Sequence, residues 1–140
     1  MKRKPALDID ALVAEALPPR PNPQLAFAIP VRTVSEANLR EHWRAKHGRK
    51  KIQQHMTVEA WPKLNGHLRA LAVVKPPCLV RLVRVGPKRL DPDNLAGSFK
   101  HVQDQIAALI GIDDGNERIK WEYEQVAVGK RVYAVRVEIY

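Results

Sequence analysis

Apolar and polar residues alternate along three stretches of the chain, residues 24–34, 119–124 and 133–139. Alternation with a period of two is typical of a β-strand that buries one face. Pro30 lies inside the first stretch and favours an edge position, because proline cannot donate a hydrogen bond to a neighbouring strand. Residues 78–85 are a further strand candidate, since they are apolar, rich in β-branched residues and followed by Gly86-Pro87.

Two longer segments have the pattern of helices. Ser35 suits a helix cap and few helix breakers follow it, which predicts a long helix over about 36–60 with Gly48 as a point of interruption. At roughly 100° per residue, the apolar residues of segment 94–110 fall on one side, which predicts a second, amphipathic helix. These apolar residues are Leu95, Phe99, Val102, Ile106, Leu109 and Ile110. Residues 63–75 fit a helix and a strand equally well and are left unassigned.

The first 23 residues differ from the rest of the chain. A short helix is predicted over residues 7–17, and the four prolines between positions 18 and 23 end it. We therefore interpret residues 1–23 as an N-terminal arm with a Pro-rich linker and residues 24–140 as the folded domain. The length of 140 residues fits one domain with one core.

The last two alternating stretches are separated by a segment that contains Gly129-Lys130, which suits a two-residue turn with glycine first. This arrangement predicts a C-terminal β-hairpin. The sequence as a whole predicts an α+β fold: a single small domain with a mixed β-sheet of about four strands, a long basic helix, a second amphipathic helix and the C-terminal hairpin.

Composition adds a strong positive charge to this picture. The chain has 24 Lys and Arg residues against 15 Asp and Glu, a net charge of +9, so a polyanion such as nucleic acid is the expected class of partner. Between positions 40 and 51 six basic residues accompany a single acid, Glu41. These phosphate-contact candidates are Arg40, Arg44, Lys46, Arg49, Lys50 and Lys51. The alternative is an ordinary solvated helix face.

Cysteine usage and hydropathy indicate the compartment. A single cysteine, Cys78, excludes a disulfide within the chain and a Cys-rich zinc site. The chain lacks an apolar run of the roughly 18 residues that span a bilayer, and its basic start is not followed by the apolar stretch of a signal peptide. We expect a cytoplasmic protein without a membrane partner and without a small-molecule cofactor.

Carboxylates gather between positions 91 and 114 of this basic chain. Each acid has a structural explanation: Asp91 suits a helix cap, Asp93 complements the helix dipole, and Asp113-Asp114-Gly115 suits a turn. Asp104 with Lys100 could form an ordinary i,i+4 ion pair. Converging acids otherwise share a proton or a cation, and their oxygens suit a hard divalent ion if the loop after the helix approaches residues 91–93.

These residues resemble the motifs of the RusA-like Holliday junction resolvases, small endonucleases often carried by prophages. The family has an Asp-x-Asp-Asn motif that enters a helix, then a lysine, an aspartate one turn on, and an Asp-Asp pair before a strand. The matching residues are Asp91-Pro92-Asp93-Asn94, Lys100, Asp104 and Asp113-Asp114, preceded by the basic Lys88 and Arg89. The resemblance covers residues 24–140 in element order and is most specific over 88–117. The commonest form of the family has its lysine where this chain has Gly97.

The resemblance implies an enzyme that resolves four-way DNA junctions by paired phosphodiester cleavage in recombination and repair, acting as a homodimer. It implies Mg²⁺, or Mn²⁺ in its place, bound by Asp91, Asp93 and Asp114, with Asp113 as the alternative to Asp114. Lys100 would be the essential base, and Asn94 and Asp104 would support the site. Lys88 and Arg89 would join the basic residues of 40–51 in binding DNA.

The main alternative is a non-catalytic, basic DNA-binding module, regulatory or architectural, in which the acids only cap and turn. A zinc site built from the histidines and Cys78 is a weaker alternative, because their spacings match no metal motif. An EF-hand starting at Asp91 is excluded, since Leu95 stands where a ligand is required and Ala96 where glycine is required.

Overall fold

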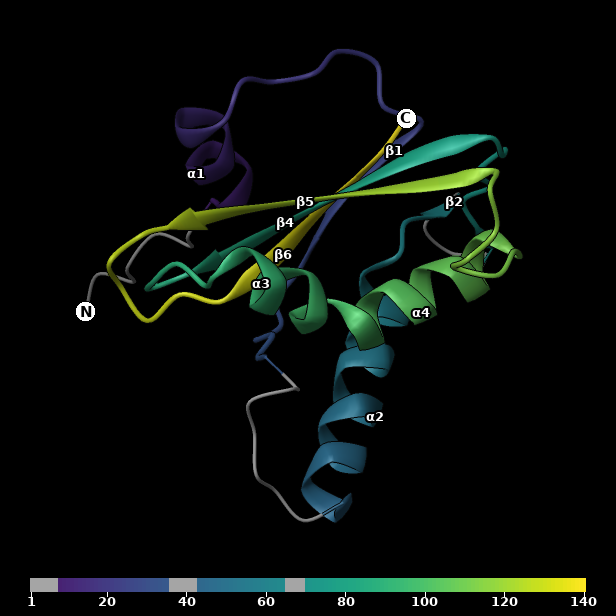
Figure 1. Ribbon diagram of the computed structural model, residues 1–140. Helices are drawn as coiled ribbons and strands as arrows, with labels where there is room; N and C mark the ends of the chain where they lie inside the picture. Colours follow the sequence, from purple (N-terminus) through teal and green to yellow (C-terminus); the bar gives the residue numbers. More distant parts are fainter. Residues whose placement is uncertain (1–7, 36–42, 65–69) are drawn as a thin grey trace, which may run out of the picture.

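The computed structural model describes residues 8–35, 43–64 and 70–140 (Figure 1). It contains a four-stranded sheet, a small two-stranded sheet and helices on both faces of the larger sheet. The elements are α1 (Ile9–Ala16), β1 (Leu25–Ile29), α2 (Trp43–Ala60), β2 (Lys63–Leu64), β3 (Ala70–Leu71), β4 (Cys78–Gly86), α3 (Pro92–Ser98), α4 (Lys100–Ile110), β5 (Ile119–Ala127) and β6 (Ala134–Ile139).

The strand order of the larger sheet is β1-β6-β4-β5. β4 pairs with β5 in parallel, whereas β6 pairs antiparallel with both β4 and β1, so the sheet is mixed. The predicted α+β class and the edge position of the first strand are confirmed. The unassigned segment 63–75 contains the short antiparallel pair β2 and β3.

The predicted C-terminal hairpin is wrong. β5 and β6 are consecutive in the chain but lie on opposite sides of β4. Gly129 does adopt a left-handed conformation, with φ of 67°, yet the segment around it carries the chain across the end of β4. Its N–H donates to the Pro87 carbonyl, and the neighbouring Val128 N–H donates to Gly86. Alternation identified the strands, but it carries no information about which strand pairs with which.

The predicted helix over 94–110 is divided into α3 and α4 at Phe99, although its apolar stripe does face the core. Ser98 Oγ donates to the Leu95 carbonyl at 2.7 Å and competes with the regular helical hydrogen bonds. Gly97 also weakens the helix at this point. The long basic helix appears as α2; the predicted start at 36–42 lies outside the described residues. Within the described ranges, no helix has both the length and the apolarity needed to cross a membrane.

Each face of the sheet packs against helices, which explains the nearly continuous apolar run of β4. Val80 and Leu82 point into the main core with Phe99, Val102 and other residues of α3 and α4. Val83 and Val85 point to the opposite face, where Val13 of α1 packs on them. The segment interpreted as an arm therefore contributes a helix that covers the second face of the sheet (Figure 1).

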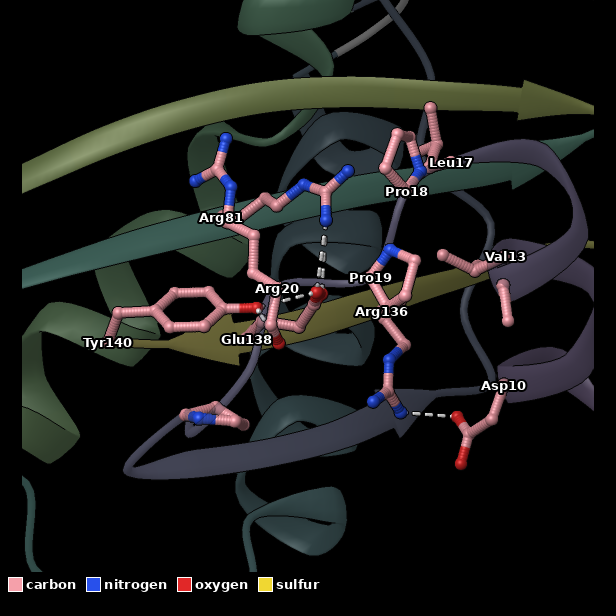
Figure 2. A pocket seen from close by; sticks show the side chains of 12 residues that line it. Asp10, Val13, Leu17, Pro18, Pro19, Arg20, Arg81, Arg136, Glu138 and Tyr140 are labelled. Atoms are coloured by element: carbon pink, nitrogen blue, oxygen red, sulfur yellow. Dashed lines mark hydrogen bonds and ion pairs between the residues drawn. The ribbon is translucent and has the colours of Figure 1, made fainter.

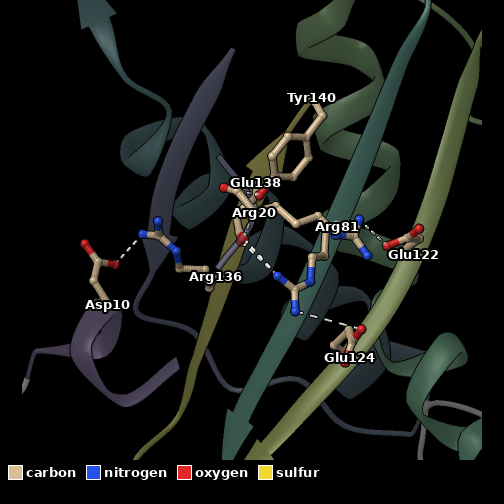
Figure 3. Close-up of polar contacts among 8 residues, drawn as sticks. All are labelled: Asp10, Arg20, Arg81, Glu122, Glu124, Arg136, Glu138 and Tyr140. Atoms are coloured by element: carbon tan, nitrogen blue, oxygen red, sulfur yellow. Dashed lines mark hydrogen bonds and ion pairs between the residues drawn. The ribbon is translucent and has the colours of Figure 1, made fainter. Parts of the chain in front are cut away.

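The face under α1 also buries charge. Arg81 and Glu138 are 3% and 6% exposed, and Arg81 Nη1 lies 3.2 Å from Glu138 Oε1. The Tyr140 hydroxyl donates to the same carboxylate at 3.1 Å (Figure 3). α1 and the proline segment after it close over these groups and leave a small cavity of about 100 Å³ (Figure 2). Burying these charges costs solvation energy, which their pairing and the hydrogen bond from Tyr140 offset.

Arg81→Met is expected to destabilise the fold by about 3–5 kcal/mol, because it leaves the Glu138 carboxylate buried without its cation. The double variant Arg81→Met/Glu138→Leu removes both charges and should recover most of this loss. Urea unfolding of the wild type, the single variant and the double variant measures both effects. Equal losses in the two variants would show that the pairing of these charges is not what stabilises this face.

Candidate functional site

The candidate acids lie at the two ends of the helix pair α3–α4. Asp91 and Asp93 are exposed at the start of α3. Asp91 occupies the cap position with an extended backbone, but its side chain makes no capping hydrogen bond. The Asn94 side chain accepts a hydrogen bond from Ser35 Oγ at 3.0 Å, which ties the start of α3 to the segment after β1. Helix capping therefore does not account for the Asp91 carboxylate.

The loop that leads to Asp91 is fixed from the sheet. Gln125 of β5 donates to the Leu90 carbonyl and accepts from the Leu90 N–H, both at 2.8 Å. Arg84 Nη1 donates to the Lys88 carbonyl at 2.9 Å. Burial is the main cause that lowers the pKa of Arg84. The exposed side chains of Lys88 and Arg89 thus project from a loop whose backbone is held in place.

The second group of acids lies in the loop between α4 and β5. A hydrogen bond shared with the Asp113 carboxyl raises the pKa of Asp114, and burial and the nearby Asp104 carboxyl add to this. The Gly115 N–H donates to Asp113 Oδ1 at 3.3 Å, and this bond, followed by the one from Asp114, lowers the pKa of Asp113. Asp114 therefore has two other carboxyl groups, those of Asp113 and Asp104, as close neighbours.

Lys100 belongs to this second group. Its Nζ lies 3.8 Å from Asp104 Oδ2, across one turn of α4. The Lys100 side chain is 67% exposed, so the pair contributes little to stability. Asp104, which the sequence indicated only as a supporting residue, is thus the residue that connects Lys100 with Asp114.

The structure does not bring Asp91 and Asp93 together with Asp114 within this chain. Leu90 is anchored to Gln125 of β5, whereas the Asp114 carbonyl accepts from Trp121 Nε1 at 3.0 Å. These anchors are four residues apart on β5, roughly 13 Å at about 3.3 Å per residue. Across the described part of the chain, no three acidic, histidine or cysteine side chains surround a point that could hold a metal ion.

The side chains that hold the helix pair on β5 were not predicted from the sequence. Trp121, Tyr123 and Gln125 alternate along one face of β5 and each contacts the α3–α4 segment or its flanking loops. Tyr123 stacks on Phe99 at 5.7 Å and its hydroxyl donates to Gln103 Oε1 at 2.6 Å. Burial raises the pKa of Tyr123. The alternation of these odd-numbered residues is visible in the sequence. Which helix their side chains face is not.

The predicted phosphate contacts lie mainly on α2. The structure places Arg44, Lys46, Arg49, Lys50 and Lys51 in its N-terminal half, whereas Arg40 lies outside the described residues. Figure 1 shows this half of α2 extending away from the sheet, while the other half packs beside α4. Glu59, near the far end, is the one acid of α2. The projecting half of α2 is therefore strongly basic.

The donor chemistry of the Asp114 group suits a hard cation. Carboxylate oxygens are the ligands that Mg²⁺ prefers, and Mg²⁺ needs only one or two of them because it keeps several waters. Asp104 on α4 and Asp113 and Asp114 in the loop after it supply such oxygens, although they do not enclose one point. These three residues thus fit partial coordination of Mg²⁺.

Asp114→Asn is expected to stabilise the metal-free protein most near neutral pH. A carboxyl whose folded pKa is raised contributes stability below its ordinary pKa of about 3.9 and loses it as pH rises through the folded pKa. Removing the charge should therefore help by less than about 1 kcal/mol around pH 7 and hardly at all around pH 3. Thermal unfolding of both proteins in EDTA measures the difference, and a gain independent of pH would contradict this account.

The comparisons with known proteins add no relative. No protein-family model matches the chain, and no curated protein or solved structure matches it.

Proposed function

We propose that this protein is a Mg²⁺-dependent, structure-selective endonuclease that cuts branched DNA and resolves Holliday junctions by paired cleavage. The observation that carries the proposal is the gathering of Asp104, Asp113 and Asp114 beside Lys100 in a protein with a net charge of +9. A basic surface attracts the DNA backbone, and a local group of carboxylates in such a surface suits a cation that works on phosphate. The resemblance to RusA-like resolvases supplies the choice of a four-way junction.

The separation of the two acidic groups favours a site that is completed by a second copy of the chain. Ligands of one Mg²⁺ lie about 2.1 Å from the ion, so the two groups of one protomer are too far apart to share it. Two helix pairs that cross with opposite directions would place Asp91 and Asp93 of one copy beside Asp114 of the other. Two-fold symmetry then gives two equal sites, which suits two symmetric cuts in a four-way junction.

In this proposal each residue has a defined task. Asp91, Asp93 and Asp114 would hold Mg²⁺, which supplies an activated water and neutralises charge on the phosphate. The Lys100 ammonium would stabilise negative charge that develops on the phosphate oxygens or on the leaving group. Asp104 keeps Lys100 directed along α4, and the basic side chains of α2 hold the DNA backbone.

A non-catalytic DNA-binding module is the second candidate. It is favoured by one observation: within the described residues of one protomer, the acids do not form a complete metal site. In that case the basic half of α2 would bind DNA. Asp113 would only stabilise the turn after α4, by accepting the hydrogen bond from the Gly115 N–H. Cleavage assays distinguish the two candidates.

Asp93→Asn and Asp114→Asn are each expected to lower Mg²⁺-dependent cleavage of a synthetic four-way junction at least a hundredfold while junction binding persists. Mixing the two inactive variants should restore about a quarter to a half of the activity, because mixed dimers contain one intact composite site. Glu15→Gln, an exposed acid of α1 on the other face, is the matched control and should cut like the wild type.

The measurement is the cleavage rate on a four-way junction and on linear duplex, with Mg²⁺ or with EDTA. Equal rates on both DNA substrates would replace the resolvase proposal with a general nuclease. If both single variants are inactive and their mixture is inactive too, the proposal of a metal site completed by a second copy of the chain is wrong. Wild-type protein that binds the junction but never cuts it would support the non-catalytic DNA-binding module in place of the nuclease.

Replacing Arg49, Lys50 and Lys51 together by Ala should weaken the dependence of DNA binding on salt. Each phosphate contact contributes about 0.9 to the slope of log affinity against log salt, so the slope should fall by up to about 2.7. Lys130→Ala/Arg131→Ala, two exposed bases in the segment between β5 and β6, is the control. Binding isotherms at several salt concentrations give the slope, and an unchanged slope would place the DNA elsewhere.

A further inference from the structure

One long edge of β5 forms no strand pair. Among the described residues, β4 pairs along one side of β5 and no strand pairs along the other. Figure 3 shows β5 as the outermost strand beside β4. β5 has nine residues, whereas β1 at the opposite edge has five and is followed by Pro30. A long edge strand without proline is a template on which a further strand can pair.

The backbone groups that point out from this edge belong to odd-numbered residues. The Arg118 carbonyl, directly before β5, accepts from the Cys78 N–H of β4 at 2.9 Å. Because the direction of the backbone groups alternates along a strand, the even-numbered residues of β5 bond to β4. The outward-pointing N–H and C=O groups are therefore those of Trp121, Tyr123 and Gln125 in the middle of the strand.

Charged side chains alternate along the face of β5 that lies toward α1. Glu122 Oε2 lies 2.7 Å from Arg20 Nη1, so this charge is already paired within the chain. Lys120 is exposed and forms no ion pair with a described residue. Glu124 is 35% exposed, and its carboxylate lies 3.9 Å from the nearest guanidinium nitrogen, that of Arg81. The edge thus offers one unpaired cation and one loosely paired anion, four residues apart in the sequence.

We infer that β5 pairs antiparallel with β5 of a second copy of the chain, with Glu122 on the two-fold axis. Lys120 of each copy then lies opposite Glu124 of the other, which gives two attractive pairs. Trp121 lies opposite Tyr123 on the other face, and their outward-pointing backbone groups exchange hydrogen bonds. The two sheets become one continuous sheet across the axis.

The charges select this register. Outward-pointing groups meet only when odd-numbered residues lie opposite odd-numbered ones, so the nearest other registers are centred on Trp121 or Tyr123. Centring on Tyr123 places Glu122 opposite Glu124 twice, which is repulsive. Centring on Trp121 pairs Lys120 with Glu122, whose charge is already neutralised within its own chain.

The same pairing brings the two acidic groups toward each other. Trp121 holds the Asp114 carbonyl, and Gln125 holds Leu90 beside Asp91. In this register Trp121 of one copy and Gln125 of the other are diagonal neighbours, about 7–8 Å apart, compared with roughly 13 Å within one chain. This step rests on the proposed function, because it takes Asp91 and Asp114 as ligands of one metal ion.

Charge reversal tests the pairing. Lys120→Glu and Glu124→Lys should each weaken dimerisation about tenfold, because two like-charged pairs replace two opposite ones. An equimolar mixture of the two variants should dimerise like the wild type, since both pairs in the mixed dimer are again opposite in charge. Lys130→Glu makes the same change at an exposed position beyond β5 and is the matched control. Sedimentation velocity over a range of protein concentrations measures the dissociation constants.

A disulfide tests the position of the axis without a change of charge pairing at residues 120 and 124. Opposite residues that do not exchange hydrogen bonds have Cα atoms about 4.5 Å apart, which a disulfide can span. Glu122→Cys should therefore form a covalent dimer in oxidised glutathione. Lys120→Cys should not, because its two copies lie roughly 13 Å apart along the strands. The wild type, with only the buried Cys78, is the control on non-reducing gels.

Three results would each overturn the inference: a wild type that stays monomeric, dimers whose affinity neither charge reversal changes, or no cross-link through Glu122→Cys. The nuclease proposal fails separately, because it depends on Mg²⁺-dependent cutting that Asp93→Asn abolishes. Dimers through β5 that never cut DNA would keep the edge pairing and lose the nuclease. Cutting by a protein whose dimers these variants do not affect would keep the nuclease and lose the edge pairing.

Discussion

The parallel pairing of β4 with β5 is the constraint on which the rest of this structure depends. Parallel neighbours need a long crossover, and here the crossover is the helix pair α3–α4. The crossover begins at one end of the sheet and finishes at the other, so residues before α3 and after α4 are held apart by the length of the helices. Asp91 and Asp114 are separated for this reason.

Much of the fold could be predicted because β5 and β6 carry polar side chains on one face and apolar ones on the other, and because the helix pair buries a single apolar stripe. The alternation in 119–124 and 133–139 identified two strands, and the stripe from Leu95 to Ile110 identified the side of the helices that faces the core. The hairpin prediction failed because partner choice depends on tertiary packing: β6 inserts between β1 and β4, where both of its edges are paired. The break at Phe99 likewise follows from a local Ser98 bond that no periodicity reveals.

For the candidate site, the sequence indicated which residue types occur and how they are spaced along the chain. It did not indicate which of their side chains lie close together in the structure. The pair Lys100 and Asp104 was predictable, since i,i+4 spacing on a helix determines it. The approach of Asp104 to Asp114 was not, because it depends on how the loop after α4 turns back toward β5. Chemistry that depends on side chains from separate elements becomes visible only in three dimensions.

The bond from Arg84 to the Lys88 carbonyl constrains the residue at a neighbouring position. A Cβ at residue 86 would lie 2.7 Å from Arg84 Nη1, so any amino acid other than glycine there would require the guanidinium to shift. Because the same guanidinium holds the Lys88 carbonyl, a side chain at residue 86 would loosen the loop that leads to Asp91. A glycine at the end of β4 thereby protects the geometry of a loop that it does not belong to.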